Sequence, residues 1–550
     1  MSGTKAPWWH TATIYQIYPR SFADSNGDGI GDLPGIISRL DYLQKLGIAA
    51  IWLSPIYKSP MDDNGYDISD YQDIAPEFGT IEDFDHLVRE AKARGIGIVL
   101  DLVVNHSSDE HPWFIEACTS RESRYRDFYI WRDAGPNGAL PSDLPSVFGG
   151  PAWTFHEPTG QYYFHQFAPG QPDLNWENPR LRAEIYKMMN WWLERGIAGF
   201  RMDVIDLIGK QVDQGITTDG PHLHDYLQEM YRETYGGRDV LTVGEAWSAT
   251  PNSALLYSGR ERKELSMVFQ FEHVTQQLDA VHGKWRPKPF DLVALKEVLG
   301  KWQLALSDDG WNSLFWGNHD LPRAVSKYGD IAGYHRQSAT MLATVLHLLK
   351  GTPYVYQGEE IGMTNATFTS IDQYKDVETL NMHRLHVEAG LSPDDFIAGA
   401  NANGRDNART PMQWSADENG GFTTGTPWIQ VNANYRSINV EQNLTDSRSI
   451  WNHYRQLIAL RKAHPVIVYG HYQSYLDKDR QFFVYTRTLE DQKLLVIANF
   501  SSQPGRLELP DELQIGGKCI SSNYEPVERL GASLEMQPYE VLAILTSGNE

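Results

Sequence analysis

The segment GIAGFRMDVIDLIGK, residues 196–210, begins as a short apolar strand and then places charged groups within it. Charged side chains seldom lie in an apolar strand without a partner or a chemical task. Arg201 and Asp203 are two residues apart, so their side chains leave the same face of a strand. The segment therefore predicts a buried strand whose carboxyl end carries functional groups.

Short apolar runs alternate with helical patterns on both sides of this segment. Residues 13–19, 49–55 and 96–106 read as strands, and residues 33–47 and 81–95 between them have helical spacing. Further strands are predicted at 199–204, 241–247, 266–271, 312–320 and 352–362. Strands that alternate with helices favour a parallel sheet, and eight of them favour a closed (β/α)8 TIM barrel in the α/β class.

Two regions interrupt the alternation. Residues 107–173 are rich in Gly, Pro, Trp, Phe and Asp, which predicts an irregular subdomain inserted after the third strand. From residue 477 the chain reads as short alternating strands with turns, which predicts a C-terminal antiparallel β-sandwich over 477–550. The catalytic barrel is then expected over 1–106 and 174–476.

Composition limits the partners. The formal net charge is −23, which disfavours nucleic acid and anionic membranes and suits a small neutral substrate. The two cysteines, Cys118 and Cys519, have neither disulfide nor zinc spacing. The amino-terminal segment has no apolar signal core. We therefore expect a cytoplasmic enzyme that acts as a monomer.

Charged residues recur where the predicted strands end. His106 ends one strand, and Glu245 and Asp320 end two others. In a (β/α)8 barrel these ends form one active-site face, and two carboxyl groups that flank a glycosidic bond are the usual apparatus of glycoside hydrolysis.

This reasoning assigns three roles. We expect Asp203 to be the nucleophile, with Arg201 holding its pKa down. Glu245, beside Trp247, suits the general acid/base, which must keep its proton near neutral pH. Asp320 would stabilise the oxocarbenium-like charge.

The short segments DLVVNH, GFRMDV, GEAW and NHD resemble, in order and spacing, the four conserved regions of the α-amylase superfamily, glycoside hydrolase family 13. The resemblance covers essentially the whole chain. SPMDDNGYDISDY, QPDLNWENP and GRDNARTPMQW narrow it to the oligo-1,6-glucosidase branch, and DVIDLIGK and GWNSLFWGNHDLPR look most like dextran glucosidase, the glucan 1,6-α-glucosidase type. The resemblance implies a retaining exo-acting enzyme that releases glucose from the non-reducing end of α-1,6-linked gluco-oligosaccharides such as isomaltooligosaccharides and panose, with dextran as a further candidate substrate.

The resemblance also implies a substrate-binding set. The terminal glucose would be bound by Asp63, Tyr66, His106, Arg201, His319 and Arg405, and the residues beyond it would be Val204, Trp247, Lys284 and Glu378. Valine after the nucleophile accompanies α-1,6 preference in this branch, and threonine accompanies α-1,4 preference. A methyl or a hydroxyl group at the border of the leaving sugar changes which sugar oxygen is accepted.

The loop DSNGDGIGD, residues 24–32, is a separate signal. Asp24, Asn26, Asp28 and Asp32, with the Ile30 carbonyl, match the ligand spacing of a calcium loop, and Gly29 supplies the turn. It is not an EF-hand, because position twelve is Gly35. An Asx-rich turn without metal is the alternative. We expect a structural Ca²⁺ ion and no cofactor for catalysis.

Other functions are compatible with the same acids. Trehalose-6-phosphate hydrolases share the architecture and the valine, and Lys284, Arg286 and Lys288 offer cations for a phosphate. Val204 argues against an α-1,4-glucosidase, and the segment after NHD lacks the arginine-rich loop of a sucrose isomerase. A non-catalytic, transporter-associated barrel would be expected to lack the acids and to carry a membrane helix.

Overall fold

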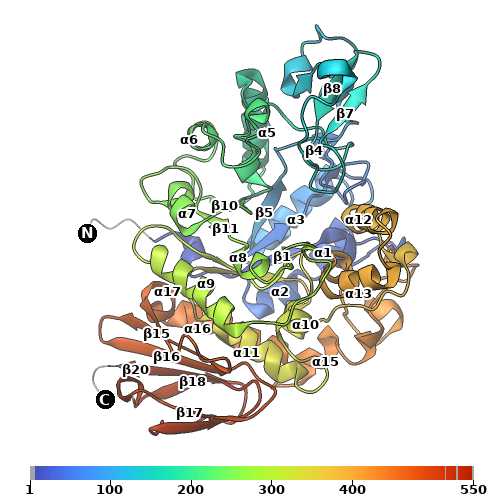
Figure 1. Cartoon of the computed structure of the whole chain (residues 1–550). Coiled ribbons are helices and arrows are strands. Elements are labelled where there is room, and N and C mark those ends of the chain that lie inside the picture. Colours follow the sequence, from blue (N-terminus) through green and yellow to red (C-terminus); the bar gives the residue numbers. More distant parts are fainter. Residues whose placement is uncertain (1–5, 515, 528–529, 548–550) are drawn as a thin grey trace.

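The computed structural model describes residues 6–514, 516–527 and 530–547 (Figure 1). Its centre is one eight-stranded sheet with the strand order β11-β10-β9-β5-β2-β1-β13-β12. The strands are β1 (Ile14–Ile17), β2 (Ala50–Leu53), β5 (Gly97–Leu102), β9 (Gly199–Met202), β10 (Leu241–Glu245), β11 (Met267–Phe269), β12 (Ser313–Leu314) and β13 (Thr352–Tyr356). The sheet's ends meet through a parallel bridge between Val268 and Asn312 and a 2.7 Å hydrogen bond from Ser313 Oγ to the Val268 carbonyl. The predicted (β/α)8 barrel is confirmed.

Helices cover the outside of the barrel (Figure 1). The longer ones are α3 (Ile81–Ala93), α5 (Pro179–Glu194), α6 (Leu223–Glu233), α7 (Pro251–Ser258), α9 (Leu292–Ala305), α11 (His335–His347) and α16 (Ile450–Ala463). The helical pattern over 33–47 forms two helices, α1 (Leu33–Ser38) and α2 (Leu40–Leu46), because Arg39 leaves the helical region at φ −108° and ψ 4°. The segment ends at Gly47, whose φ of 99° needs a residue without Cβ.

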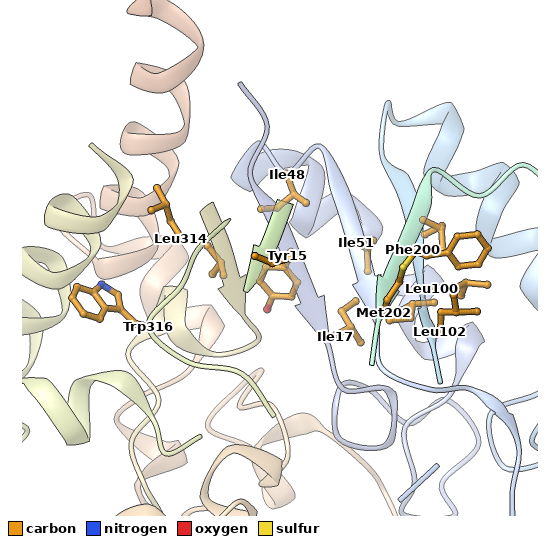
Figure 2. Close-up of a cluster of buried hydrophobic side chains, with 14 of the residues drawn as sticks. Tyr15, Ile17, Ile48, Ile51, Leu100, Leu102, Phe200, Met202, Leu314 and Trp316 are labelled. Carbon is orange, nitrogen blue, oxygen red and sulfur yellow. The ribbon is translucent and has the colours of Figure 1, made fainter. Parts of the chain in front are cut away.

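Alternate strand residues build two hydrophobic layers. Tyr15, Ile51, Leu100, Phe200 and Met202 are buried between the strands and the helices, as Figure 2 shows for this cluster. The intervening residues fill the barrel interior; among them are Ile14, Trp52, Val99, Val243, Met267 and Phe269. Arg201 alternates with Phe200 and Met202, so its side chain lies on the interior side.

The inserted subdomain starts and ends at the barrel top. His106 and Asp173 form an antiparallel bridge, which brings the predicted boundaries 107 and 173 side by side. Between them lie α4 (Pro112–Ala117) and a small antiparallel sheet of β6 (Trp131–Arg132), β7 (Trp153–His156) and β8 (Gln161–Phe164). Trp153 and Phe164 form a local core with Ile130 and Val212.

The C-terminal region is antiparallel, as predicted. A five-stranded sheet contains β14 (His471–Tyr475), β15 (Phe482–Leu489), β16 (Gln492–Asn499), β18 (Lys518–Ser522) and β20 (Val541–Ser547). A second sheet pairs β17 (Gly505–Glu508) with β19 (Ser533–Met536), and apolar residues of both sheets share one core. The first strand begins at His471, six residues before the predicted boundary at 477. Within the described ranges, no helix has the length and apolar character needed to span a bilayer.

Candidate active site

A cavity of about 540 Å³ opens above the carboxyl ends of the barrel strands. Most of the predicted catalytic and substrate-binding residues line it: Asp63, Tyr66, His106, Asp203, Val204, Glu245, Trp247, Lys284, Asp320, Glu378 and Arg405. Arg201 and His319 lie behind this lining and contact it through carboxylates. Residues more than 300 positions apart therefore converge, as strand order in a barrel requires.

Arg201 is the centre of a buried carboxylate cluster. Its Nη1 lies 2.8 Å from Asp203 Oδ1 and 2.8 Å from Asp101 Oδ1, and its Nη2 lies 2.6 Å from Glu245 Oε2. The guanidinium is 1% exposed, so these contacts form in a low-dielectric setting. One cation thus holds the predicted nucleophile and the predicted acid in a fixed relation.

The expected direction of the Asp203 pKa is wrong. Burial raises the pKa of Asp203 well above its usual range; Arg201 lowers it, and the charges of Glu245 and Asp101 raise it again. The close approach of the Glu245 carboxyl group thus adds to the effect of burial on the pKa of Asp203.

Glu245 is oriented by two donors. The backbone N–H of Val204 donates to its Oε2 across 3.1 Å, and Trp247 Nε1 donates to its Oε1 across 3.0 Å. The Trp247 ring stacks on Phe271, with a centroid separation of 3.8 Å and an interplanar angle of 10°. Trp247 is 42% exposed, so it adds an aromatic face to the cavity wall.

Asp320 is surrounded by cations. Its Oδ1 lies 2.9 Å from Arg409 Nη2 and 3.3 Å from Arg405 Nη1. Burial opposes ionisation, but the guanidinium groups of Arg405 and Arg409 lower the pKa of Asp320 well below its usual range. Asp320 is therefore an anion in the free protein, as its proposed electrostatic role requires.

Arg405 joins several acids of the cavity. Its Nη2 lies 3.0 Å from Asp63 Oδ1 and 2.5 Å from Asp376 Oδ1. Asp376 also caps α12 (Val377–Glu388) by accepting from the Thr379 amide. This cap places Glu378 at the start of the helix, where its Oε2 lies 2.5 Å from Lys284 Nζ. The two residues carried over from the resemblance, Lys284 and Glu378, are thus paired in the cavity wall.

The two predicted histidines are neutral. Burial lowers the pKa of His106 to about 4 and that of His319 to about 3. Gln16 Nε2 lies 2.9 Å from His319 Nδ1, and His319 Nε2 lies 3.2 Å from Asp320 Oδ2. A donor at Nδ1 leaves the proton on Nε2, which is buried and has no hydrogen-bond partner among the described residues. The His319 ring also stacks on Tyr66 at 5.2 Å.

The sequence patterns did not indicate several residues that line the cavity. The inserted subdomain contributes Val147, Phe148, Gln166 and Phe167, and the loops after β9 and β10 contribute Asp206, Leu207, Thr217, Thr218 and Ser248. Asp206 Oδ2 accepts from Ser248 Oγ at 2.7 Å and from Thr218 Oγ1 at 3.2 Å, which ties two loops together. Asp206 stands three residues after the nucleophile, and this nearness in the sequence was the one feature that could have indicated a place in the cavity lining.

The candidate calcium loop forms a network of Asx turns. The Asp24 carboxylate accepts from the amides of Asn26, Gly27 and Gly29 at 2.8–2.9 Å. Asp32 caps α1 by accepting from the Gly35 amide at 2.6 Å. The oxygen donor set suits a hard cation, but these bonds use some of the lone pairs that the ion would take. Across the ranges described, no cluster of three or more His, Cys, Asp or Glu side chains is arranged to hold a metal ion. Calcium at Asp24, Asn26, Asp28, Ile30 and Asp32 stays a prediction.

Comparison with known proteins identifies the family. The α-amylase catalytic domain matches residues 16–470, and the C-terminal domain of the α-amylase SusG matches residues 482–542. The chain is 56% identical to a palatinase of Erwinia rhapontici, with 98% of each chain covered, and 54% identical to a glucan 1,6-alpha-glucosidase of Streptococcus pneumoniae, with 94% of each covered. The crystal structure of trehalose-6-phosphate hydrolase from Bacillus licheniformis superposes with a TM-score of 0.94 at 47% identity, covering 98% of this chain and 100% of that one. The chain belongs to the α-amylase family, glycoside hydrolase family 13.

Proposed function

We propose that this protein is a retaining, exo-acting α-glucosidase that releases glucose from the non-reducing end of α-1,6-linked gluco-oligosaccharides. The carrying observation is the cavity in which Arg201 holds Asp203 and Glu245 together, with Asp320 in the same lining and Val204 directly after the nucleophile. The 54% sequence identity to a glucan 1,6-alpha-glucosidase supports a preference for the α-1,6 linkage.

The chemistry is a double displacement. Asp203 attacks the anomeric carbon while Glu245 donates a proton to the leaving oxygen, which gives a β-glucosyl-Asp203 intermediate. Glu245 then takes a proton from water, and the resulting hydroxide attacks the anomeric carbon and releases Asp203. The anionic Asp320 stabilises the positive charge that develops on the sugar ring in both steps.

One end of the cavity suits a single terminal glucose. Asp63, Asp320 and Arg405 form an ion-paired wall there, with 3.0 and 3.3 Å contacts from Arg405. The Arg405 guanidinium lies 5.1 Å from the ring centre of Phe148, a residue of the inserted subdomain. This wall offers acceptors and donors to the hydroxyls of a terminal sugar, which supports exo action.

The cavity suits a neutral sugar better than a phosphorylated one. Lys284 and Arg405 are the cations of its lining in the described structure, and both are paired with carboxylates. Arg286 and Lys288, the other cations considered for a phosphate, are exposed and lie outside the lining. A bound phosphate would have to break the Lys284–Glu378 pair.

Initial rates on isomaltose, panose, dextran, maltose and trehalose 6-phosphate, with one enzyme stock in one buffer, test the proposal. We expect isomaltose and panose to be hydrolysed fastest, and the released glucose to be the α-anomer. Faster hydrolysis of trehalose 6-phosphate would overturn the substrate class while leaving the catalytic acids in place. Initial release of the β-anomer would overturn the retaining mechanism.

A further inference from the structure

A chain of hydrogen bonds runs from Lys210, in the segment after β9, to the cavity wall. Lys210 Nζ donates to Asn105 Oδ1 across 2.7 Å, and it lies 3.1 Å from Asp173 Oδ2. Asn105 Nδ2 lies 3.1 Å from His106 Nδ1. His106 Nε2 lies 2.9 Å from the Tyr66 carbonyl oxygen. Lys210 is absent from the cavity lining, whereas His106 and Tyr66 belong to it.

The direction of each bond in this chain follows from the groups at its ends. Gln171 Nε2 also lies 3.3 Å from His106 Nε2, but its two protons have acceptors in Asp63 Oδ2 and the Tyr66 carbonyl. The Tyr66 carbonyl can only accept, so His106 Nε2 carries a proton. A neutral imidazole then has an acceptor at Nδ1, which needs the NH₂ group of Asn105. This orientation turns Asn105 Oδ1 toward Lys210, whose ammonium can only donate. Rotation of the Asn105 amide would bring its NH₂ group against the ammonium.

We propose that Lys210 is a positioning residue: through Asn105, its ammonium keeps His106 in the neutral Nε2–H tautomer at the wall of the glucose pocket. Without that ammonium, only the longer 3.4 Å bond from Asn105 Nδ2 to Asp173 Oδ2 opposes a rotation of the amide that would offer its oxygen to Nδ1. That arrangement would stabilise a protonated His106, which places a positive charge where a neutral sugar binds.

The charges around His106 agree with this role. Burial lowers the pKa of His106 to about 4, Asp173 raises it, and Lys210 lowers it again. Gln171 Nε2 bridges from the Tyr66 carbonyl, at 3.2 Å, to Asp63 Oδ2, at 3.1 Å, on the third side. Removing Lys210 leaves Asp173 without its ammonium partner, so both the rotated amide and the remaining anion would favour the imidazolium.

Nuclear magnetic resonance of ¹⁵N-histidine-labelled protein tests the inference, with the His106 signals assigned by their loss in His106→Gln. In the wild type we expect the neutral Nε2–H tautomer from pH 5.5 to 8. A wild-type His106 that is protonated or carries its proton on Nδ1 at pH 6 would overturn the proposal without any variant. In Lys210→Met we expect His106 to titrate between pH 5.5 and 7.5.

The rate profile supplies a second readout. For Lys210→Met we expect kcat/KM on isomaltose to fall about 10-fold more at pH 5.5 than at pH 7.5, relative to the wild type. Lys210→Arg, which keeps the charge, and Lys187→Met, which removes an exposed lysine of α5, should both retain the wild-type profile. An unshifted His106 in folded Lys210→Met would overturn the proposal. The rate readout rests on the proposed function, whereas the ¹⁵N shifts do not, so the two can fail separately.

Discussion

The backbone amide of Val204 donates a hydrogen bond to Glu245 Oε2 across 3.1 Å. To make it, Val204 adopts a left-handed conformation at φ 33° and ψ 47°. Such a conformation costs a β-branched residue about 1–3 kcal/mol. The residue after the nucleophile thus acts twice: its amide orients the general acid, and its side chain borders the cavity.

Val204→Thr should increase activity on maltose relative to isomaltose. Threonine has nearly the same shape and keeps the amide, so the main change is a hydroxyl in place of a methyl group beside the leaving sugar. We expect the ratio of kcat/KM on maltose to that on isomaltose to rise on the order of 10-fold. Val440→Thr, a buried valine outside the cavity lining, is the matched control. An unchanged ratio would assign Val204 to packing and to the amide bond alone.

Glu245→Gln should slow hydrolysis in proportion to the leaving group's need for a proton. On isomaltose we expect kcat to fall by about 10²–10⁴-fold, because the amide cannot donate the proton to a sugar alkoxide. On 4-nitrophenyl α-glucoside the first step needs little protonation, so a burst of nitrophenol should precede slow turnover.

Asp203→Ala should abolish turnover on both substrates, and circular dichroism would check that each variant is folded. Substantial activity in Asp203→Ala would overturn Asp203 as the nucleophile. An equal effect of Glu245→Gln on both substrates from the first turnover would overturn Glu245 as the general acid.

The barrel was predictable because its strands are short apolar runs that end in charged residues. Arg201, Asp203 and Glu245 stood out for that reason, and the closed barrel then brought them together. The pKa of Asp203 was not predictable, because the sequence pattern offered Arg201 as the partner of one acid. The structure shows that Arg201 is shared with Asp101 and Glu245, so the nucleophile receives only part of its charge.

The cavity mouth was not predictable either. Val147, Phe148 and Phe167 come from an irregular subdomain with no periodic pattern, and only the folded chain brings them over the strand ends. Val204 reads as a strand residue, yet β9 ends at Met202 and the chain turns there. A tight turn of this kind depends on long-range contacts. Here the contact joins Val204 to Glu245, which is 41 residues further along the sequence.

The unfolding free energy should fall as the pH rises from about 5 to about 8, and Glu359 should contribute to that fall. Burial and the neighbouring Glu360 raise the pKa of Glu359 to about 8, although it accepts from the Tyr454 hydroxyl at 2.7 Å. Between its usual pKa and this value the folded protein binds a proton that the unfolded chain has released, so stability falls as the pH rises, by on the order of 5 kcal/mol over the whole range.

Glu359→Gln keeps an acceptor for Tyr454 and does not titrate. Differential scanning calorimetry at pH 5.5 and pH 8.5 should therefore show a smaller loss of Tm for Glu359→Gln than for the wild type. Glu388→Gln changes an exposed glutamate of α12 and should retain the wild-type loss. Equal losses in all three proteins would exclude Glu359 as the titrating group.

Chelation should lower Tm without changing the rate at moderate temperature, if the loop of residues 24–32 holds Ca²⁺. The loop follows β1 and packs through Asp24 against Thr423, so a bound ion would stabilise the fold rather than the cavity. We expect EDTA to lower Tm by a few degrees and Ca²⁺ to restore it, with kcat on isomaltose unchanged at 25 °C.

Asp28→Ala should remove this response, because Asp28 is exposed and its carboxylate is a predicted ligand. Asp308→Ala, an exposed aspartate elsewhere, should retain the response. Equal Tm in EDTA and in Ca²⁺ for the wild type would identify the loop as an Asx-rich turn without metal.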